Sequence, residues 1–369
     1  NAPAAATTTA KLGLLTFDLD DTLYPISLIL NEANLVYART MANFGYGDDI
    51  DRSKIVGMVK LIRKELTESD PEMAITVTHT EIRKMAIRRA MEEVVFERNL
   101  EEVAMDWGTE VESLTQTVVD NAKKWASTSV SESVIQAVLN AWEMERHHSA
   151  ERHVYPEIID VFKQIKAEHP DVIIGAVTDG KANPLLMTFT LAKYFDFCMN
   201  WEDDQSGRSR FFKELDDVKG NAELTWIYNA AVEKYESMAK IRQEAKREDS
   251  SETTSSTSTS TTPREEKRIW IHVGDDLAYD VGGAAACGAK TIYCELDVER
   301  YGQTDRLRFT QDEESQPSWS TTTMKELEKR RVLNEAAKPH VSKTIKYLGR
   351  IPDCIDDILR DCERDDGFE

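Results

Sequence analysis

Short apolar runs separated by long stretches of helical character constrain this chain more than any other feature of its sequence. Each run is long enough for one buried strand and too short for a typical helix. The candidate strands are 11–17, 171–177, 195–199, 268–273, 289–294 and 340–345. Strands that alternate with helices are typical of a doubly wound parallel sheet, so we predict an α/β fold.

A block of helical character separates the first two candidate strands. Across 24–153 the apolar residues recur at helical spacing, as Ile82, Met85 and Ala86 illustrate. A connection of this length is too long for a simple crossover between neighbouring strands. We therefore predict a core formed by 1–23 plus 154–369, with 24–153 inserted as a separate helical subdomain.

Two polar segments interrupt the predicted core. Residues 250–262 are all Ser or Thr except Glu252. Such a stretch cannot bury apolar area, so we expect a disordered insertion over about 242–268. A second polar stretch, about 297–336, is expected to be an irregular insertion. Further helices are expected at 156–168, 223–241, 277–287 and 352–360.

Charge and hydropathy exclude several classes of partner. The chain has 46 Lys and Arg against 67 Asp and Glu, a formal net charge of −21. This balance disfavours nucleic acid and anionic membrane surfaces, both of which require a basic face. The mean hydropathy is −0.49, and no apolar run is long enough to span a bilayer. We expect a soluble globular protein.

The cysteines and the first residues bear on the cellular compartment of the protein but do not define it. The five cysteines include no CxxC pair, which suits free thiols in a reducing compartment. Residues 1–10 are rich in Ala and Thr and lack acidic residues. They are either a disordered tail of a cytoplasmic protein or the remnant of a transit peptide to an organelle stroma or matrix.

Acidic and hydroxyl residues directly follow three of the candidate strands. Asp18 and Asp20 follow the first, Thr178 follows the second, and Asp275 follows the run at 268–273. The carboxyl ends of parallel strands form one ligand crevice, so these side chains should lie close together. Clustered carboxylates repel one another unless a hard cation such as Mg²⁺ binds them. A carboxylate can also attack a phosphoryl group, so the cluster indicates transfer of a phosphoryl group from a phosphorylated substrate.

Three segments resemble motifs of the haloacid dehalogenase (HAD) superfamily, namely FDLDDTLYP, AVTDG and HVGDDLAYDVGGAAACGAKTIY. The resemblance implies a HAD-like Rossmannoid core covered by a helical cap. It implies Asp18 as the nucleophile and Asp20 as the general acid and base. Thr178 and the backbone N–H of Gly180 would bind phosphoryl oxygens. Mg²⁺ would be held by Asp18, the Asp20 carbonyl and Asp275. Dehalogenases of the superfamily lack an acid at the position of Asp20, so the resemblance points to a phosphatase.

Neighbouring acidic residues have alternative interpretations. The resemblance implies that Asp276 and Asp280 support the metal site, but Asp276 is equally suited to be the N-cap of the helix at 277–287. Asp21 is expected to be a turn or surface residue and not a ligand.

The third motif of the superfamily, a Lys ahead of a helix, matches least well. The chain reads GRSRFFKELDDVKGN over 207–221. Arg210 stands where the family has Lys, and Lys213 and Lys219 follow. We favour Lys219, because a compact ammonium group can bridge Asp18 and a phosphoryl oxygen.

Within the superfamily the chain is most similar to flavin-pathway phosphatases, which act on amino(phosphoribitylamino)uracil phosphate or flavin mononucleotide. The segment at 71–91 contributes to this resemblance, and Arg83 within it is the candidate substrate-binding residue. His79, Arg83 and Arg88 could instead form a solvated helix face. Two other functions stay open. One is a phosphatase for another small metabolite, such as a sugar phosphate or nucleotide, and the other is a non-catalytic binding module.

Overall fold

The computed structural model describes nine stretches of the chain, 9–47, 52–70, 73–74, 77–202, 222–251, 266–303, 316–317, 319–322 and 324–365. The chain forms two compact units. Unit 1 contains 1–25, 153–304 and 329–369, and unit 2 contains 26–152 and 305–328. The predictions made for residues 1–8, for most of the Ser/Thr tract and for the third motif fall outside the described residues.

Unit 1 is built on a six-stranded sheet in the order β3-β2-β1-β4-β5-β6. Every neighbouring pair is parallel. The strands are β1 (Thr9–Phe17), β2 (Ile173–Thr178), β3 (Phe197–Asn200), β4 (Glu266–Gly274), β5 (Lys290–Cys294) and β6 (Lys343–Ile345). The order reverses between β1 and β4, which confirms the predicted doubly wound α/β fold and places its ligand crevice beyond these two strands.

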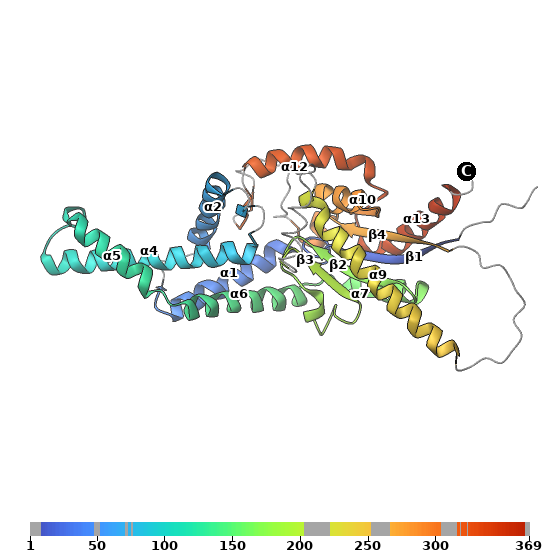
Figure 1. Ribbon diagram of the computed structural model, residues 1–369, viewed down its shortest axis with the longest axis horizontal. Helices are drawn as coiled ribbons and strands as arrows, with labels where there is room; N and C mark the ends of the chain where they lie inside the picture. Colours follow the sequence, from blue (N-terminus) through green and yellow to red (C-terminus); the bar gives the residue numbers. More distant parts are fainter. Residues whose placement is uncertain are drawn as a thin grey trace, which may run out of the picture. The chain divides into compact units, whose positions relative to one another are not determined.

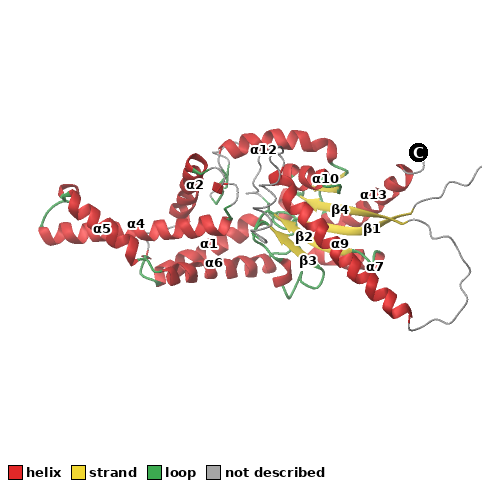
Figure 2. Ribbon diagram, viewed as in Figure 1, coloured by secondary structure: helices red, strands yellow, loops and turns green. Residues whose placement is uncertain are grey.

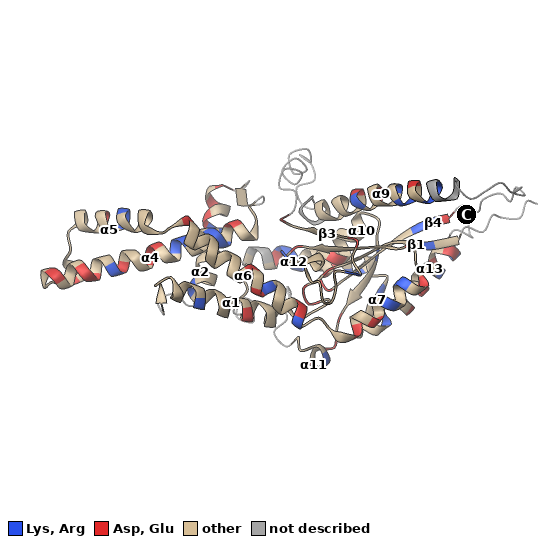
Figure 3. Ribbon diagram, turned by 90° about the horizontal axis from the view of Figure 1, so that it is seen from below, with Lys and Arg blue, Asp and Glu red and all other residues tan. Residues whose placement is uncertain are grey.

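Helices cover both faces of this sheet (Figures 1 and 2). One layer contains α9 (Ala222–Ser251), η4 (Leu277–Gly283) and α10 (Ala284–Ala286), and the other contains α7 (Pro156–Glu168) and α13 (Ile351–Asp365). Leu14 joins the apolar cluster of the first layer, whereas the Phe17 ring lies 5.0 Å from that of Phe162 in α7. Both faces of β1 are therefore buried, which explains its continuous apolar run. Figure 3 shows α9 and α7 on opposite sides of the strands.

The first predicted insertion is shorter than expected, because α9 continues to Ser251. Two ion pairs lie along the extended part of this helix. Arg242 pairs with Asp196 at 2.7 Å, and Lys246 pairs with Asp171 at 2.6 Å. These ion pairs attach the polar end of α9 to the sheet layer, which the composition of the segment did not indicate.

The second predicted insertion, 297–336, also contains regular structure. Residues Val298–Tyr301 form α11, and Met324–Ala337 form α12. Tyr301 packs its ring 4.8 Å from that of Tyr155. Residues 305–328 group with the helical unit and not with the core, so the expectation of an irregular core insertion was wrong for the described part of this segment.

Unit 2 is helical. Its longer helices are α1 (Ile26–Asn43), α2 (Arg52–Ser69), α4 (His79–Trp107), α5 (Gln116–Ser129) and α6 (Glu132–Arg152). The limits of α4 follow from local sequence. Thr78 and Glu81 form a capping box at its start, and Gly108 ends it in a left-handed conformation with φ of 60°.

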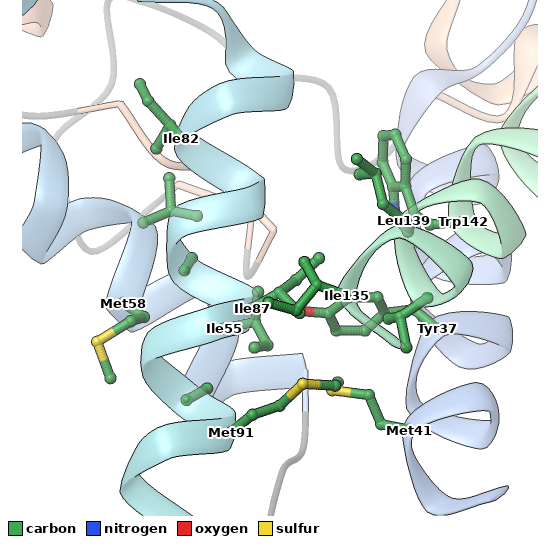
Figure 4. Packing of buried hydrophobic residues seen from close by; sticks show 14 of the residues in the cluster. Tyr37, Met41, Ile55, Met58, Ile82, Ile87, Met91, Ile135, Leu139 and Trp142 are labelled. Atoms are coloured by element: carbon green, nitrogen blue, oxygen red, sulfur yellow. The ribbon is translucent and has the colours of Figure 1, made fainter. Parts of the chain in front are cut away.

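The apolar core of unit 2 joins α1, α2, α4 and α6 (Figure 4). Tyr37, Met91 and Trp142 belong to it, each at most 2% exposed. Trp319 from 305–328 donates its indole N–H to Ser27 Oγ at 3.0 Å. The segment at 319–322 therefore contributes to this unit although it follows β5 in sequence.

No helix among the described stretches is long and apolar enough to cross a membrane. The five cysteines are free thiols. Lys and Arg are interspersed with Asp and Glu along α9 and α13 (Figure 3).

Candidate active site

The turn after β1 directs the first acidic side chains. Asp18 is 6% exposed, and its backbone N–H donates to the carbonyl of Val273 on β4 at 2.9 Å. The Thr22 hydroxyl lies 3.4 Å from Asp18 Oδ2 and 3.5 Å from Asp275 Oδ1. Thr22 therefore sits between two of the predicted site residues and can donate to either of them.

Asp21 occupies a turn, one of its two predicted positions, but it is buried and not on the surface. It lies in the turn with φ of 57°, and only 5% of it is exposed. Its carbonyl accepts a hydrogen bond from Gln303 Nε2 at 2.6 Å. Asp tolerates the left-handed region better than most residues, so Asp21 shapes the turn that presents Asp18.

Three carboxylates meet beyond β1 and β4. One oxygen from each of Asp18, Asp275 and Asp280 lies within 4.8 Å of the others. The structure therefore brings the predicted Asp18 and Asp275 together. It adds the carboxylate of Asp280 to this cluster as a possible direct ligand, where a supporting role was expected. The carboxylate of Asp20 is not part of this group, and the predicted role of its carbonyl stays a prediction.

This cluster fits a hard divalent cation. Burial raises the pKa of Asp18 well above its ordinary value, and the charges of Asp280, Asp275 and Asp20 raise it further. Without a compensating charge, burial and the neighbouring carboxylates therefore oppose the ionisation of Asp18. Mg²⁺ binds through a small number of carboxylates and would remove this penalty. Asp18, Asp275 and Asp280 are the described residues that could hold it.

A buried polar network fixes Asp280. The Tyr228 hydroxyl donates to Asp280 Oδ1 at 3.1 Å, and His272 Nε2 lies 3.4 Å from the same oxygen. Trp270 donates to Thr16 Oγ1 at 2.8 Å, and this hydroxyl lies 2.8 Å from His272 Nδ1. The Thr16 hydroxyl can then donate to Nδ1, which leaves the His272 Nε2–H to donate to Asp280.

The sequence prediction did not include this network. His272 stands inside an apolar run, and Tyr228 stands inside α9. His272 is fully buried, and the only local signal was a titratable residue within a strand.

The loop after β2 carries the predicted phosphoryl-binding groups. Thr178 is 2% exposed, and its Oγ1 accepts a hydrogen bond from the Gly180 N–H at 3.2 Å. The two predicted residues therefore lie together in one tight turn. Their part in binding a phosphoryl group stays a prediction.

Asp276 is the N-cap of η4. Its Oδ1 accepts from the Tyr279 N–H at 2.9 Å, while its Oδ2 pairs with Arg330 of α12. Burial raises the pKa of Asp276, and the Arg330 guanidinium opposes that rise. The N-cap interpretation of Asp276 is confirmed. Arg330 was not predicted, because it lies in the segment expected to be irregular.

The remaining candidates lie elsewhere. Lys219, Lys213 and Arg210 are outside the described residues. Arg83 lies on α4 in unit 2, with its guanidinium carbon 3.6 Å from the ring centroid of Trp142. Substrate binding by Arg83 stays a prediction.

Arg83 and Trp142 line a small cavity of about 30 Å³ within unit 2. Asn34 and Tyr37 also line it. Trp142 donates to Asn34 Oδ1 at 2.9 Å. The cavity has room for about one water molecule.

Gly274 makes the approach of Asp280 possible, which gives a testable prediction. A Cβ at position 274 would lie 2.2 Å from Asp280 Oδ2. We expect Gly274→Ala to displace this carboxylate, to lower the free energy of unfolding by about 1–3 kcal/mol, and to weaken divalent-cation binding. Melting temperatures with and without Mg²⁺ measure both effects. Gly349→Ala is the control, since nothing lies within 4 Å of its Cβ. Equal behaviour of the two variants would contradict the prediction.

Comparison with known proteins identifies structural neighbours but no family assignment. No family model and no curated protein matches the chain. A 2-haloacid dehalogenase from Pseudomonas syringae pv. tomato DC3000 is 16% identical, with a TM-score of 0.43 over 94% of this chain and 99% of that one. A β-phosphoglucomutase from Clostridium difficile is 9% identical, with a TM-score of 0.38 over 95% and 98%.

A third neighbour is a predicted phosphoglycolate phosphatase from Haemophilus somnus 129PT. It is 12% identical, with a TM-score of 0.32 over 77% of this chain and 85% of that one. The neighbours thus include a dehalogenase, a mutase and a predicted phosphatase, and they assign no single reaction to this chain.

Proposed function

We propose that this protein is a Mg²⁺-dependent phosphomonoester hydrolase of the HAD type, acting through a phosphorylated Asp18. The observation that carries the proposal is the meeting of Asp18, Asp275 and Asp280 where the strand order reverses. The residues after β1, β2 and β4 supply a carboxylate nucleophile, a hydroxyl donor and an acidic metal site. Phosphoryl transfer from an ester requires these parts.

The chain's own groups supply the nucleophile and the proton transfers of a two-step reaction. An oxygen of Asp18 attacks phosphorus in line with the ester oxygen, and the bond between phosphorus and that oxygen breaks. Asp20 donates its proton to the leaving alcohol. Asp20 then takes a proton from water, which attacks the phosphoryl group on Asp18, releasing inorganic phosphate and the free carboxylate. Mg²⁺, when bound, neutralises negative charge on the phosphoryl oxygens.

Other residues orient these groups. Thr178 and the Gly180 N–H are proposed to bind the phosphoryl oxygens. Thr22 can donate to Asp18 Oδ2, which leaves the other oxygen of Asp18 for attack. Lys219 is proposed to bridge Asp18 and the phosphoryl group, with Lys213 and Arg210 as alternatives.

Asp20 favours a phosphatase over a dehalogenase. Halide leaves without a proton, whereas an alkoxide needs one, so only the phosphatase needs an acid beside the nucleophile. Asp20 lies two residues after Asp18, and its backbone pairs with that of Tyr24 in an isolated bridge. This pairing supports a fixed turn at Asp20.

As substrate we propose amino(phosphoribitylamino)uracil phosphate or flavin mononucleotide, with Arg83 as a binding residue. The basis is the sequence resemblance of the chain to flavin-pathway phosphatases, to which the segment at 71–91 contributes. A sugar phosphate or a nucleotide is the alternative.

Phosphate release from a panel of these esters, measured with Mg²⁺ and with EDTA, tests the proposal. We expect turnover with Mg²⁺, fastest on the riboflavin precursor, and about background rates in EDTA, because uncompensated carboxylates would repel the anionic ester. Turnover only on other esters would keep the reaction and reject the substrate. A folded protein that binds Mg²⁺ but hydrolyses no ester would favour a non-catalytic binding module. Release of halide from 2-haloacids would contradict the phosphatase assignment.

A further inference from the structure

The positively charged guanidinium of Arg330 lies at the edge of the acidic site and is largely buried. Arg330 lies in α12, and its side chain is 12% exposed. Its Nη1 pairs with Asp276 Oδ2, and its Nη2 lies 3.9 Å from Asp179 Oδ2. The guanidinium carbon lies 3.8 Å from the ring centroid of Tyr279. The carboxylates of Asp179 and Asp276, which follow β2 and β4, and the ring of Tyr279 in η4 therefore surround this guanidinium.

Packing of the last turns of α12 defines where this guanidinium lies. Ala337, two turns after Arg330 and on the same helix face, lies against η4: a Cβ added to Gly282 would be 3.2 Å from its own Cβ. Asn334, on the same face, is 5% exposed. The part of α12 from Arg330 to Ala337 therefore packs against other elements of unit 1. This packing limits where the guanidinium can lie.

The partner of Arg330 is linked to two proposed metal ligands. Asp276 directly follows Asp275 in the chain, and the backbone N–H of Asp276 donates to Asp280 Oδ2 at 2.8 Å. The Oδ1 of Asp276 accepts a hydrogen bond from the Tyr279 N–H. One carboxylate oxygen therefore caps η4, and the other is held by Arg330. A change in the conformation of Asp276 would therefore disturb the backbone next to Asp275 and next to Asp280.

We propose that Arg330 is a positioning residue of the acidic site. By holding Asp276, it keeps the segment 275–280 in the geometry in which Asp275 and Asp280 bind a divalent cation together with Asp18. This role rests on the proposed function only in requiring that the acidic cluster be a metal site. Burying a guanidinium costs free energy that an ion pair only partly recovers, so local order and not net stability is the expected benefit.

The effect of Arg330→Met on Mg²⁺ affinity separates positioning from charge. If Arg330 acted only through its charge, its removal would leave the site more negative and tighten Mg²⁺ binding. If it acts by positioning, its removal weakens binding, with an expected rise in Kd of about 10- to 100-fold, as for other residues that orient metal ligands. The Kd is obtained without substrate, from the dependence of the melting temperature on Mg²⁺ concentration.

Two further variants test whether Arg330 acts through Asp276. We expect Asp276→Asn to weaken Mg²⁺ binding, and the double variant with Arg330→Met to be no weaker than the worse single variant. Arg331→Met is the matched control, since Arg331 is the next residue of α12 and is exposed. Its Mg²⁺ affinity should equal that of the wild type. Additive losses in the double variant would overturn the proposal.

Arg330→Lys keeps the test decisive if Arg330→Met does not fold. Lys retains the charge but not the planar guanidinium that contacts Asp276 and Tyr279 together. A Kd clearly above that of the wild type, by up to about 100-fold, would support positioning. Wild-type affinity in either variant, or tighter binding, would overturn it. A wild-type protein that binds no Mg²⁺ would instead contradict the proposed function itself.

Discussion

Asp18→Asn is expected to abolish phosphate release while the protein stays folded. Asn keeps the shape of Asp18 but cannot form the phosphorylated carboxylate, so we expect the turnover number to fall by about 10⁴-fold or more. The measurement is phosphate release with Mg²⁺ on the best ester of the panel. Asp160→Asn is the control, because Asp160 is an exposed acid on α7 whose side chain is 81% accessible. Retained turnover in Asp18→Asn would exclude Asp18 as the nucleophile.

The same substitution has a second expected result, on stability without metal. Burial and the neighbouring carboxylates raise the folded-state pKa of Asp18. A raised pKa means that the folded wild type loses stability as the pH rises from the unfolded-state pKa, about 3.9, through the folded-state pKa. Asn carries no such penalty. Metal-free Asp18→Asn should therefore melt at a higher temperature than the wild type at pH 7.

This stability difference should depend on pH. It should shrink as the pH falls and vanish below about pH 4, where Asp18 is protonated in both states. Melting curves in EDTA across this range measure it. A difference in melting temperature that does not change with pH would contradict a raised pKa of Asp18 in the folded state.

Asp20→Asn is expected to slow hydrolysis in proportion to how much the leaving group needs a proton. On an alkyl phosphate we expect a loss of about 10²- to 10⁴-fold, the usual contribution of a positioned acid. On p-nitrophenyl phosphate, whose phenolate leaves without protonation, the first step should be much less affected. Single-turnover rates with both esters measure this difference.

The leaving-group dependence is specific to the proposed role of Asp20. Loss of a metal contact or of folding would slow both esters alike. Equal losses on the two esters would therefore contradict Asp20 as the general acid, and the Mg²⁺ dependence of the melting temperature would then report whether its main contribution is to the metal site.

The local sequence predicted the frame of the core because its central strands are buried on both faces. The continuous apolar run of β1 ends at Phe17, and that of β4 ends at Gly274. Their ends placed Asp18 and Asp275 without knowledge of any contact. The helix Pro156–Glu168 also has the predicted limits, since Pro at its first position and its apolar periodicity are both local signals.

Polar segments were harder to predict. The end of α9 and all of α12 are rich in Lys, Arg and Glu, which have high helix propensity, but their tertiary contacts involve partners distant in sequence. Arg242 reaches Asp196, and Arg330 reaches Asp276. Periodicity within a segment contains no information about such partners.

The sequence by itself determined that this chain forms a parallel α/β core and that acidic and hydroxyl residues follow its strands, because strand length and burial pattern are local properties. Only the tertiary structure decided that Asp280 joins Asp18 and Asp275, that His272 and Tyr228 hold it, and that Arg330 binds Asp276. These contacts join residues that are separated in sequence by up to hundreds of positions. Which of them meet is set by the packing of α9, β4 and α12 against one another, through the shapes and charges of side chains that no single segment specifies.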